Sequence, residues 1–97
     1  MRLQFSWDEN KNRSNYRKHR VFFETATLVF DDPDFVMMQD RTVDGEERWQ
    51  TIGLVEDVLL LLVVHTLGGE GDEEIVRIIS AREVTWHERR RYEDSQA

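Results

Sequence analysis

The sequence predicts a small α+β domain in which an N-terminal strand and two helices precede an antiparallel meander of three to four strands and a C-terminal helix. Near residue 35 the spacing of apolar residues changes from helical to alternating. The apolar run at 58–64 then indicates a strand with both faces covered, in the middle of the sheet. Because 97 residues suffice for only one small core, we expect one domain over residues 1–97.

The N-terminal third is expected to hold the first strand and both helices. Apolar and polar residues alternate over 3–7, which predicts a short half-buried strand. Asp8 is a typical N-cap for a helix over 9–19. That helix has almost no apolar face beyond Tyr16, so it is either exposed or functional. A second helix over 23–30 is stopped by the Asp-Asp-Pro-Asp sequence that follows it.

The remaining elements follow from alternation and turn signals. We expect strands over 35–39, 46–54, 58–66 and 74–79, with hairpin connections at 56–57 and 67–72. Ser80-Ala81-Arg82-Glu83 has the pattern of a capping box, in which the serine hydroxyl and the glutamate carboxylate each accept a backbone N–H. This pattern predicts a last helix from Ala81 to about Asp94.

The composition excludes several classes of site. No cysteine is present, which excludes disulfides, thiolate metal ligands and a cysteine nucleophile, and favours a reducing compartment. The longest apolar run is too short for a membrane span, and the N-terminus lacks the apolar core of a signal peptide. We therefore expect a cytoplasmic protein without a membrane partner.

The distribution of charge matters more than its sum. A formal net charge of −7 argues against a nucleic-acid partner, because Lys and Arg must neutralise phosphates in such binding. The basic residues nevertheless gather in two segments, 11–20 and 82–91. Such clusters can hold a local phosphate site. The alternative is that they are solvated helix faces.

The sequence lacks the common catalytic motifs. The histidines at 19, 65 and 87 lack metal-ligand spacing, no glycine-rich phosphate loop precedes a helix, and no Ser-His-Asp set stands out. We therefore expect neither a metal nor a cofactor.

Two arginines in predicted strands are the remaining chemical signal. Alternation places Arg77 on the same face as the isoleucines two residues to either side, which is unfavourable for a guanidinium unless it meets an anion. Arg48 lies beside the apolar Trp49 and shares a face with Glu46 and Gln50. The alternative is that each arginine simply pairs with an acidic side chain.

Several segments, taken in order, carry a resemblance over almost the whole chain. They are Phe5-Ser6-Trp7-Asp8-Glu9-Asn10-Lys11, Asn15, Arg17-Lys18-His19, Glu47-Arg48-Trp49 followed by Gly53, and Arg77-Ile78-Ile79-Ser80-Ala81-Arg82 continued by Glu88-Arg89-Arg90-Arg91-Tyr92. Together they resemble the BrnT toxins of bacterial type II toxin-antitoxin pairs. The resemblance implies a fold similar to the RelE ribonuclease toxins, metal-independent RNA cleavage that inhibits translation, and neutralisation by a BrnA-like, DNA-binding antitoxin encoded beside the toxin. It leaves open whether the RNA is cut on a ribosome.

RNA cleavage through its own 2′-hydroxyl needs a base, positive charge on the phosphate and an acid for the leaving oxygen. Together with the resemblance, this chemistry assigns phosphate and transition-state charge to Arg48, Arg77 and Arg82. Lys18 is expected to bind substrate and His19 to act as acid or base. A helix cap is the alternative role of His19.

The arrangement of these residues is also predicted. Glu47 is a weaker base candidate, because a regular strand turns it away from Arg48. We expect the three arginines to converge on one concave face and form an anion site, with Arg82 in the first turn of the last helix.

Other residues are assigned to binding. Lys11, Arg17 and Arg89 are expected to contact RNA. Trp86 and Arg90 are expected to contact the antitoxin, because Trp and Arg are enriched at interface hot spots. The alternative for Trp86 is a place in the domain's own core.

Three positions depart from the BrnT pattern. Arg20 stands where the family usually has glycine, and Phe22 where it usually has a capping Ser or Thr. After the central strand, an acidic loop over 70–74 follows in place of a Tyr and a basic residue. These departures keep two alternatives open: a catalytically inactive, toxin-like binding module, or a DNA-associated regulator, for which no helix-turn-helix pattern is present.

Overall fold

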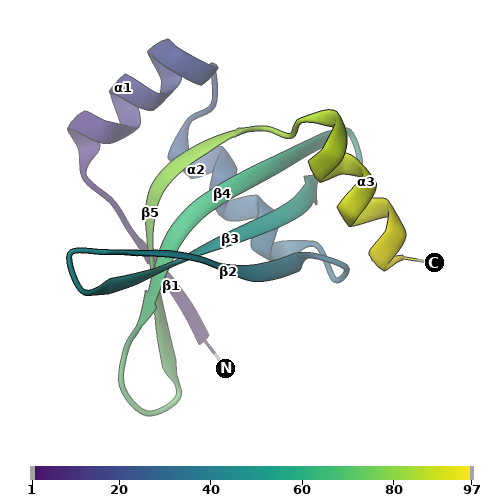
Figure 1. Cartoon of the computed structure of the whole chain (residues 1–97). Coiled ribbons are helices and arrows are strands. Elements are labelled where there is room, and N and C mark those ends of the chain that lie inside the picture. The colour runs from purple at the N-terminus through teal and green to yellow at the C-terminus, as the bar shows by residue number, and fades with distance from the viewer. Residues whose placement is uncertain (1, 97) are drawn as a thin grey trace.

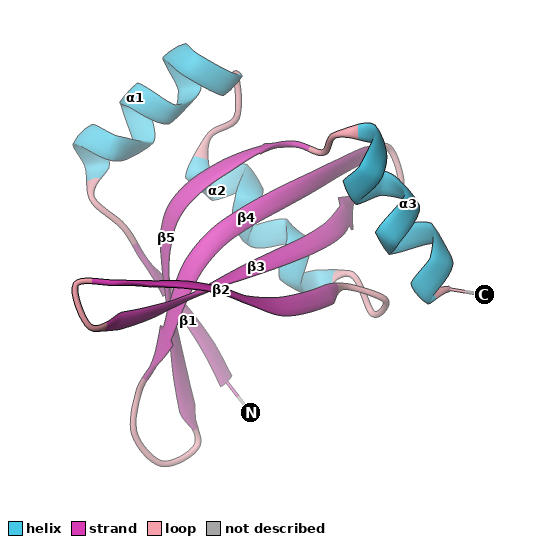
Figure 2. Cartoon of the chain, in the orientation of Figure 1, coloured by secondary structure: helices cyan, strands magenta, loops and turns pink. Residues whose placement is uncertain are grey.

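A computed structural model of the chain describes residues 2–96 and places five strands in one sheet, in the order β1-β5-β4-β3-β2 (Figures 1 and 2). The strands are β1 (Arg2–Ser6), β2 (Val36–Val43), β3 (Glu46–Val55), β4 (Leu59–Gly68) and β5 (Glu73–Glu83). The predicted meander is confirmed, since β2 to β5 pair antiparallel in sequence order. The central position of β4 is also confirmed. The N-terminal strand β1 forms one edge of the sheet and pairs parallel to β5.

The helices lie on both sides of the sheet (Figure 2). Helix α1 (Glu9–His19) begins as predicted, because Asp8 Oδ1 accepts hydrogen bonds from the backbone N–H groups of Asn10 (2.8 Å) and Lys11 (3.2 Å). The predicted second helix divides into a short α2 (Phe23–Ala26) and a 3-10 helix, η1 (Thr27–Asp31). None of the helices in residues 2–96 is long and apolar enough to cross a membrane.

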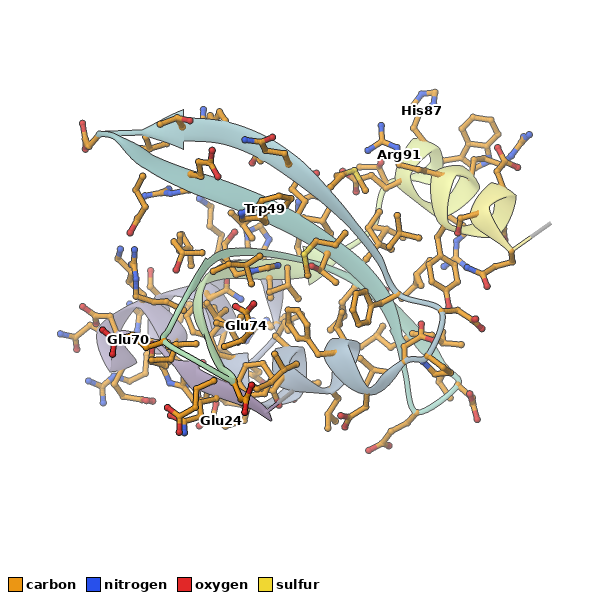
Figure 3. All side chains as sticks on the ribbon, turned by 90° about the horizontal axis from the view of Figure 1, so that it is seen from below. Glu24, Trp49, Glu70, Glu74, His87 and Arg91 are labelled. Carbon is orange, nitrogen blue, oxygen red and sulfur yellow. The ribbon has the colours of Figure 1, made fainter. Side chains whose placement is uncertain are left out.

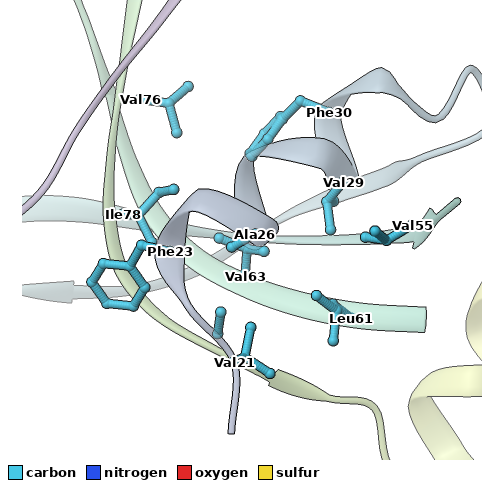
Figure 4. Close-up of a cluster of buried hydrophobic side chains, with 11 residues drawn as sticks. Val21, Phe23, Ala26, Val29, Phe30, Val55, Leu61, Val63, Val76 and Ile78 are labelled. Atoms are coloured by element: carbon cyan, nitrogen blue, oxygen red, sulfur yellow. The ribbon is translucent and has the colours of Figure 1, made fainter. Parts of the chain in front are cut away.

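The larger core lies between α2, η1 and one face of the sheet (Figure 4). Phe23, Ala26 and Val29 are fully buried there against Leu61 and Val63 of the central strand. The backbone of β3 passes so close to η1 that a Cβ built on its residue 53 would lie 2.7 Å from the Val29 carbonyl oxygen. Only glycine therefore fits at position 53 without displacing η1.

The opposite face of the sheet has a smaller core under the C-terminal helix, α3 (Trp86–Ser95). Leu60 and Leu62 of β4 are buried there, with Tyr92 of α3 packed against the cluster. The Tyr92 hydroxyl also donates a 2.6 Å hydrogen bond to Asp32, which follows η1. This contact ties α3 to the segment between the two cores.

The predicted start of the last helix is wrong. Residues 80–83 continue β5, where Ser80 pairs with Val64 and Glu83 with Leu61. The capping box lies further on: Glu88 N–H donates to Thr85 Oγ1, and Thr85 N–H donates to the Glu88 carboxylate at 2.8 Å. Pairing with β4 satisfies backbone groups that the predicted helix would have used. Arg82 is therefore a strand residue and not part of a helix's first turn.

The two departures that flank the link between α1 and α2 are visible in the backbone. Arg20 ends α1 in the left-handed region, with φ 61°, where glycine is preferred. Phe22 occupies the N-cap of α2 without a side-chain hydrogen bond. Its ring instead stacks on Tyr16, with centroids 4.0 Å apart. The N–H of Phe23, the first residue of α2, donates to Asn12 Oδ1, so a side chain of α1 supplies the acceptor that the N-cap lacks.

Candidate functional site

Two buried asparagines dock helix α1: Asn15 attaches it to β5 of the sheet, and Asn12 attaches it to the start of α2. The side chain of Asn15 donates to the Ala81 carbonyl at 2.9 Å and accepts from the Ala81 N–H at 3.1 Å, so it replaces a strand partner at the edge of β5. Asn12 accepts from Phe23 N–H at 2.7 Å. The prediction that a helix without an apolar face is exposed or functional was therefore incomplete, because polar side chains dock it.

A polar pocket of about 180 Å³ lies between α1 and β5. It is lined by Lys11, Ser14, Asn15, Lys18, His19, Ile79 and Ser80. Three of the residues predicted from the sequence are thus together: Lys11, Lys18 and His19. Arg17 lies on the same helix and is exposed but does not line the pocket.

A β-bulge brings β5 into this pocket. Val64 and His65 are consecutive on β4, yet they pair with Ser80 and Ile78, so Ile79 is an extra residue on β5. Sequence reasoning used Ser80 as a helix cap and so missed its place in the pocket. A break in the alternation of apolar and polar residues can indicate a bulge in a strand. Such a break does not show which residue is the extra one.

Arg77 and Arg48 lie on the sheet face opposite the larger core. Arg77 pairs with Thr66, which alternates with Val64 on one face of β4, and Val64 pairs with Gln50 on β3. Arg48 is two residues from Gln50 and so shares that face. The predicted common face of Arg48 and Arg77 is therefore present in the register of the strands.

The surroundings of these two arginines differ. Arg77 Nη2 lies 2.6 Å from Glu46 Oε1, in an ion pair whose side chains are 40% and 45% exposed. Arg48 is half-buried, and its Nε atom is buried with no hydrogen-bond partner among residues 2–96. A buried guanidinium N–H without an acceptor costs free energy, which an anion would recover.

Arg82 shares this face through its pairing with Leu62, but a carboxylate already holds it. Its Nη1 and Nη2 atoms lie 2.8 Å and 2.9 Å from the two oxygens of Glu88. The hydrogen bond from Arg82 lowers the pKa of Glu88 to about 2, and Glu88 raises the pKa of Arg82. Arg82 thus links the end of β5 to the first turn of α3.

The acidic residue at the arginines is Glu46 and not Glu47. Glu47 is exposed on β3 and, by alternation, faces away from Arg48 as expected. Glu46 is the carboxylate that contacts Arg77. The sequence placed Glu46 on the same face as Arg48. Only the structure shows that Glu46 reaches across β4 to Arg77 on β5.

His65 is part of the core and not of this site. Its Nδ1 atom lies 3.0 Å from the Thr66 carbonyl oxygen, and its Nε2 atom lies 2.7 Å from Thr51 Oγ1. Since a carbonyl can only accept, Nδ1 carries the proton and Nε2 accepts from the Thr51 hydroxyl. Burial lowers the pKa of His65, so the ring is neutral in the folded protein.

The outer face of α3 is basic and aromatic. Trp86 is 63% exposed, which excludes the alternative that it fills the domain's own core. The guanidinium carbon of Arg90 lies 5.3 Å from the centroid of the Trp86 ring, and the His87 ring packs edge-on against Trp86 with centroids 5.0 Å apart. Arg89 is exposed on the same helix, and His87 projects from it away from the sheet (Figure 3).

The chain is similar to known toxins in sequence and in fold. The family profile of the ribonuclease toxin BrnT of type II toxin-antitoxin systems matches residues 7–88. The crystal structure of the Brucella abortus ribonuclease toxin BrnT superimposes with a TM-score of 0.59 at 21% identity, covering 87% of this chain and 99% of that one. No curated protein sequence matches the chain.

Proposed function

Because this chain belongs to the BrnT family of ribonuclease toxins of type II toxin-antitoxin systems, we propose that it cleaves RNA at the face formed by β3 and β5. The observation that carries the proposal is the pair Arg48 and Arg77, one with an unpartnered buried N–H and the other held only by an exposed carboxylate. The forked donors of a guanidinium match the oxygens of a phosphate at both positions.

The proposed chemistry uses the RNA's own 2′-hydroxyl as nucleophile. A phosphate that binds Arg77 displaces Glu46 and leaves its carboxylate beside the substrate. Glu46 then removes the 2′-hydroxyl proton, the oxygen attacks phosphorus, and the departing 5′-oxygen takes a proton from an acid. Arg48 and Arg77 stabilise the charge that develops on the phosphate oxygens. The products are a 2′,3′-cyclic phosphate and a 5′-hydroxyl.

The pocket between α1 and β5 supplies the next part of the site. Lys11 and Lys18 bind a neighbouring phosphate, and His19 is the candidate acid, since its side chain is half-buried in the pocket rather than used as a cap. Ser80 connects this pocket to the arginine face, because the bulge at Ile79 lets Ser80 pair with Val64, which lies on the same face as Thr66, the partner of Arg77. Arg17 and Arg89 extend the RNA contacts over α1 and α3.

The biological setting follows from the family. Membership in a type II toxin-antitoxin family implies an antitoxin partner. We propose that this partner is a BrnA-like, DNA-binding protein that neutralises the toxin and contacts Trp86 and Arg90. The free toxin would cleave RNA without a metal ion, and this cleavage would inhibit translation. The chain would act in the cytoplasm.

One observation favours the second candidate, an inactive binding module. Arg77 and Arg82 are each paired with a glutamate, as purely structural arginines are. The two functions are separated by incubating the purified protein with end-labelled RNA, with and without a chelator and with and without ribosomes. Cleavage that persists with the chelator supports the ribonuclease, and intact RNA in every reaction supports the binding module.

A further inference from the structure

The larger core is open at one end, where an apolar groove of about 380 Å³ lies between β1, η1 and the β4–β5 hairpin. Its apolar lining consists of Leu3, Phe30, Phe35, Met37, Leu67 and Val76. Phe30 and Val76 are buried members of that core, whereas Leu3 and Phe35 are 38% and 37% exposed at the mouth. Helices α2 and η1 cover the rest of this face but end at Asp31. The groove is therefore a part of the apolar core surface that neither α2 nor η1 covers.

The groove has an acidic rim. Glu74 lines the groove, and Figure 3 shows it and Glu70 on the β4–β5 hairpin. Glu70 and Asp72 are exposed in the part of this hairpin that joins Leu67 to Glu74, two residues that line the groove. No Lys or Arg lines the groove. A nucleic acid would be repelled by these carboxylates, so this surface is separate from the RNA-binding face.

We propose that the groove binds a segment of the antitoxin in which one or two large apolar side chains are flanked by Lys or Arg. The apolar side chains fill the groove, and the basic ones meet the acidic rim. The inference rests on the antitoxin partner named above. A second copy of this chain is a poorer occupant, because a symmetric dimer through this surface would bring two acidic rims together. Since the groove lies apart from Arg48 and Arg77, it anchors the antitoxin without covering the arginines.

The test measures binding of the full-length protein to the product of the adjacent gene, the expected antitoxin, by calorimetry. Leu3→Gln removes an exposed apolar contact from the mouth of the groove. The double variant Glu70→Lys/Asp72→Lys reverses the rim in an exposed hairpin and leaves the core untouched. A charge-matched control, Glu47→Lys/Glu83→Lys, makes the same change at exposed strand residues that do not line the groove.

We expect the groove variants to bind the antitoxin about tenfold more weakly or worse, and the control to bind within about twofold of the unmodified protein. Raising the salt concentration should weaken binding of the unmodified protein. Unchanged affinity in Glu70→Lys/Asp72→Lys would overturn the proposal, as would a dimer in light scattering that this variant abolishes.

RNA cleavage is measured on the same preparations. Groove variants that cut RNA normally but bind the antitoxin weakly support the groove. An unmodified protein that binds the antitoxin but leaves RNA intact contradicts the ribonuclease and not the groove. An adjacent gene product that does not bind the unmodified chain overturns both the antitoxin and the proposed occupant.

Discussion

Arg77 and Glu46 meet across a strand that separates them. Nη2 of Arg77 on β5 lies 2.6 Å from Oε1 of Glu46 on β3, and β4 runs between the two strands. Because both side chains are about half exposed, the pair contributes at most about 1 kcal/mol to folding. A phosphate can therefore replace the carboxylate at little cost.

Replacing Arg77 should abolish most RNA cleavage. Both Arg77→Ala and Arg77→Lys are expected to lower the single-turnover rate about a hundredfold, because lysine keeps the charge but loses the forked contact with phosphate. In bacteria, expression of the unmodified chain is expected to arrest growth, and both variants should relieve that arrest. Circular dichroism must show a folded protein. A fully active Arg77→Lys protein would mean that only the charge matters.

Glu46→Gln should lower the cleavage rate about a hundredfold or more, because the amide cannot accept a proton from the 2′-hydroxyl. RNA binding should be unchanged or tighter, since no carboxylate then competes for Arg77. Rates and filter binding are compared with those of Glu47→Gln, the neighbour on the opposite face. If Glu47→Gln is the inactive variant, the assignment of the base to Glu46 is wrong.

Arg82→Ala should destabilise the fold more than it affects the chemistry. Its loss leaves the Glu88 carboxylate, now without its forked partner, at the start of α3, and we expect a cost of about 1–2 kcal/mol after allowing for exposure. Urea denaturation measures this cost. A stable Arg82→Ala protein that has lost cleavage would instead return Arg82 to the catalytic set.

The interaction of Glu88 with Arg82 also predicts that the folded protein loses stability in acid. The pKa of Glu88 falls from its ordinary 4.5 to about 2 on folding. Its contribution to stability is therefore complete above about pH 4.5 and is lost as pH falls toward 2. In Arg82→Ala this part of the pH dependence of the free energy of unfolding should shrink.

His65 should make the protein less stable below neutral pH. Burial lowers its pKa below 6.5, so the unfolded chain binds a proton that the folded chain does not. The stability is complete above pH 6.5 and decreases as pH falls below it. The free energy of unfolding is measured by urea between pH 7.5 and 5, with the exposed His87→Gln as control. His65→Gln should remove this dependence, and an unchanged slope in that variant would contradict the assignment.

The sequence alone determined where the strands lie, apart from the end of β5, and also the first helix cap and the face on which two arginines lie. These features depend on neighbours along the chain. Alternation fixes that Arg77 shares a face with its neighbours two residues away, and Asp8 caps α1 through amides two and three residues on. The resemblance to BrnT, confirmed by the family match, was likewise carried by ordered local segments. The likeness to RelE toxins and the roles of the site residues stay predictions.

Only the tertiary structure decided what depends on partners far along the chain. The Ser80–Glu83 segment satisfies a local capping pattern, yet pairing with β4 wins because it satisfies more backbone groups in the core. Asn15 holds Ala81 from 66 residues away, and Glu46 meets Arg77 from 31 residues away, contacts for which a single sequence has no periodic signal. The pocket, the exposed Trp86 and the open groove follow in the same way, because strand order and helix docking decide which surfaces are covered.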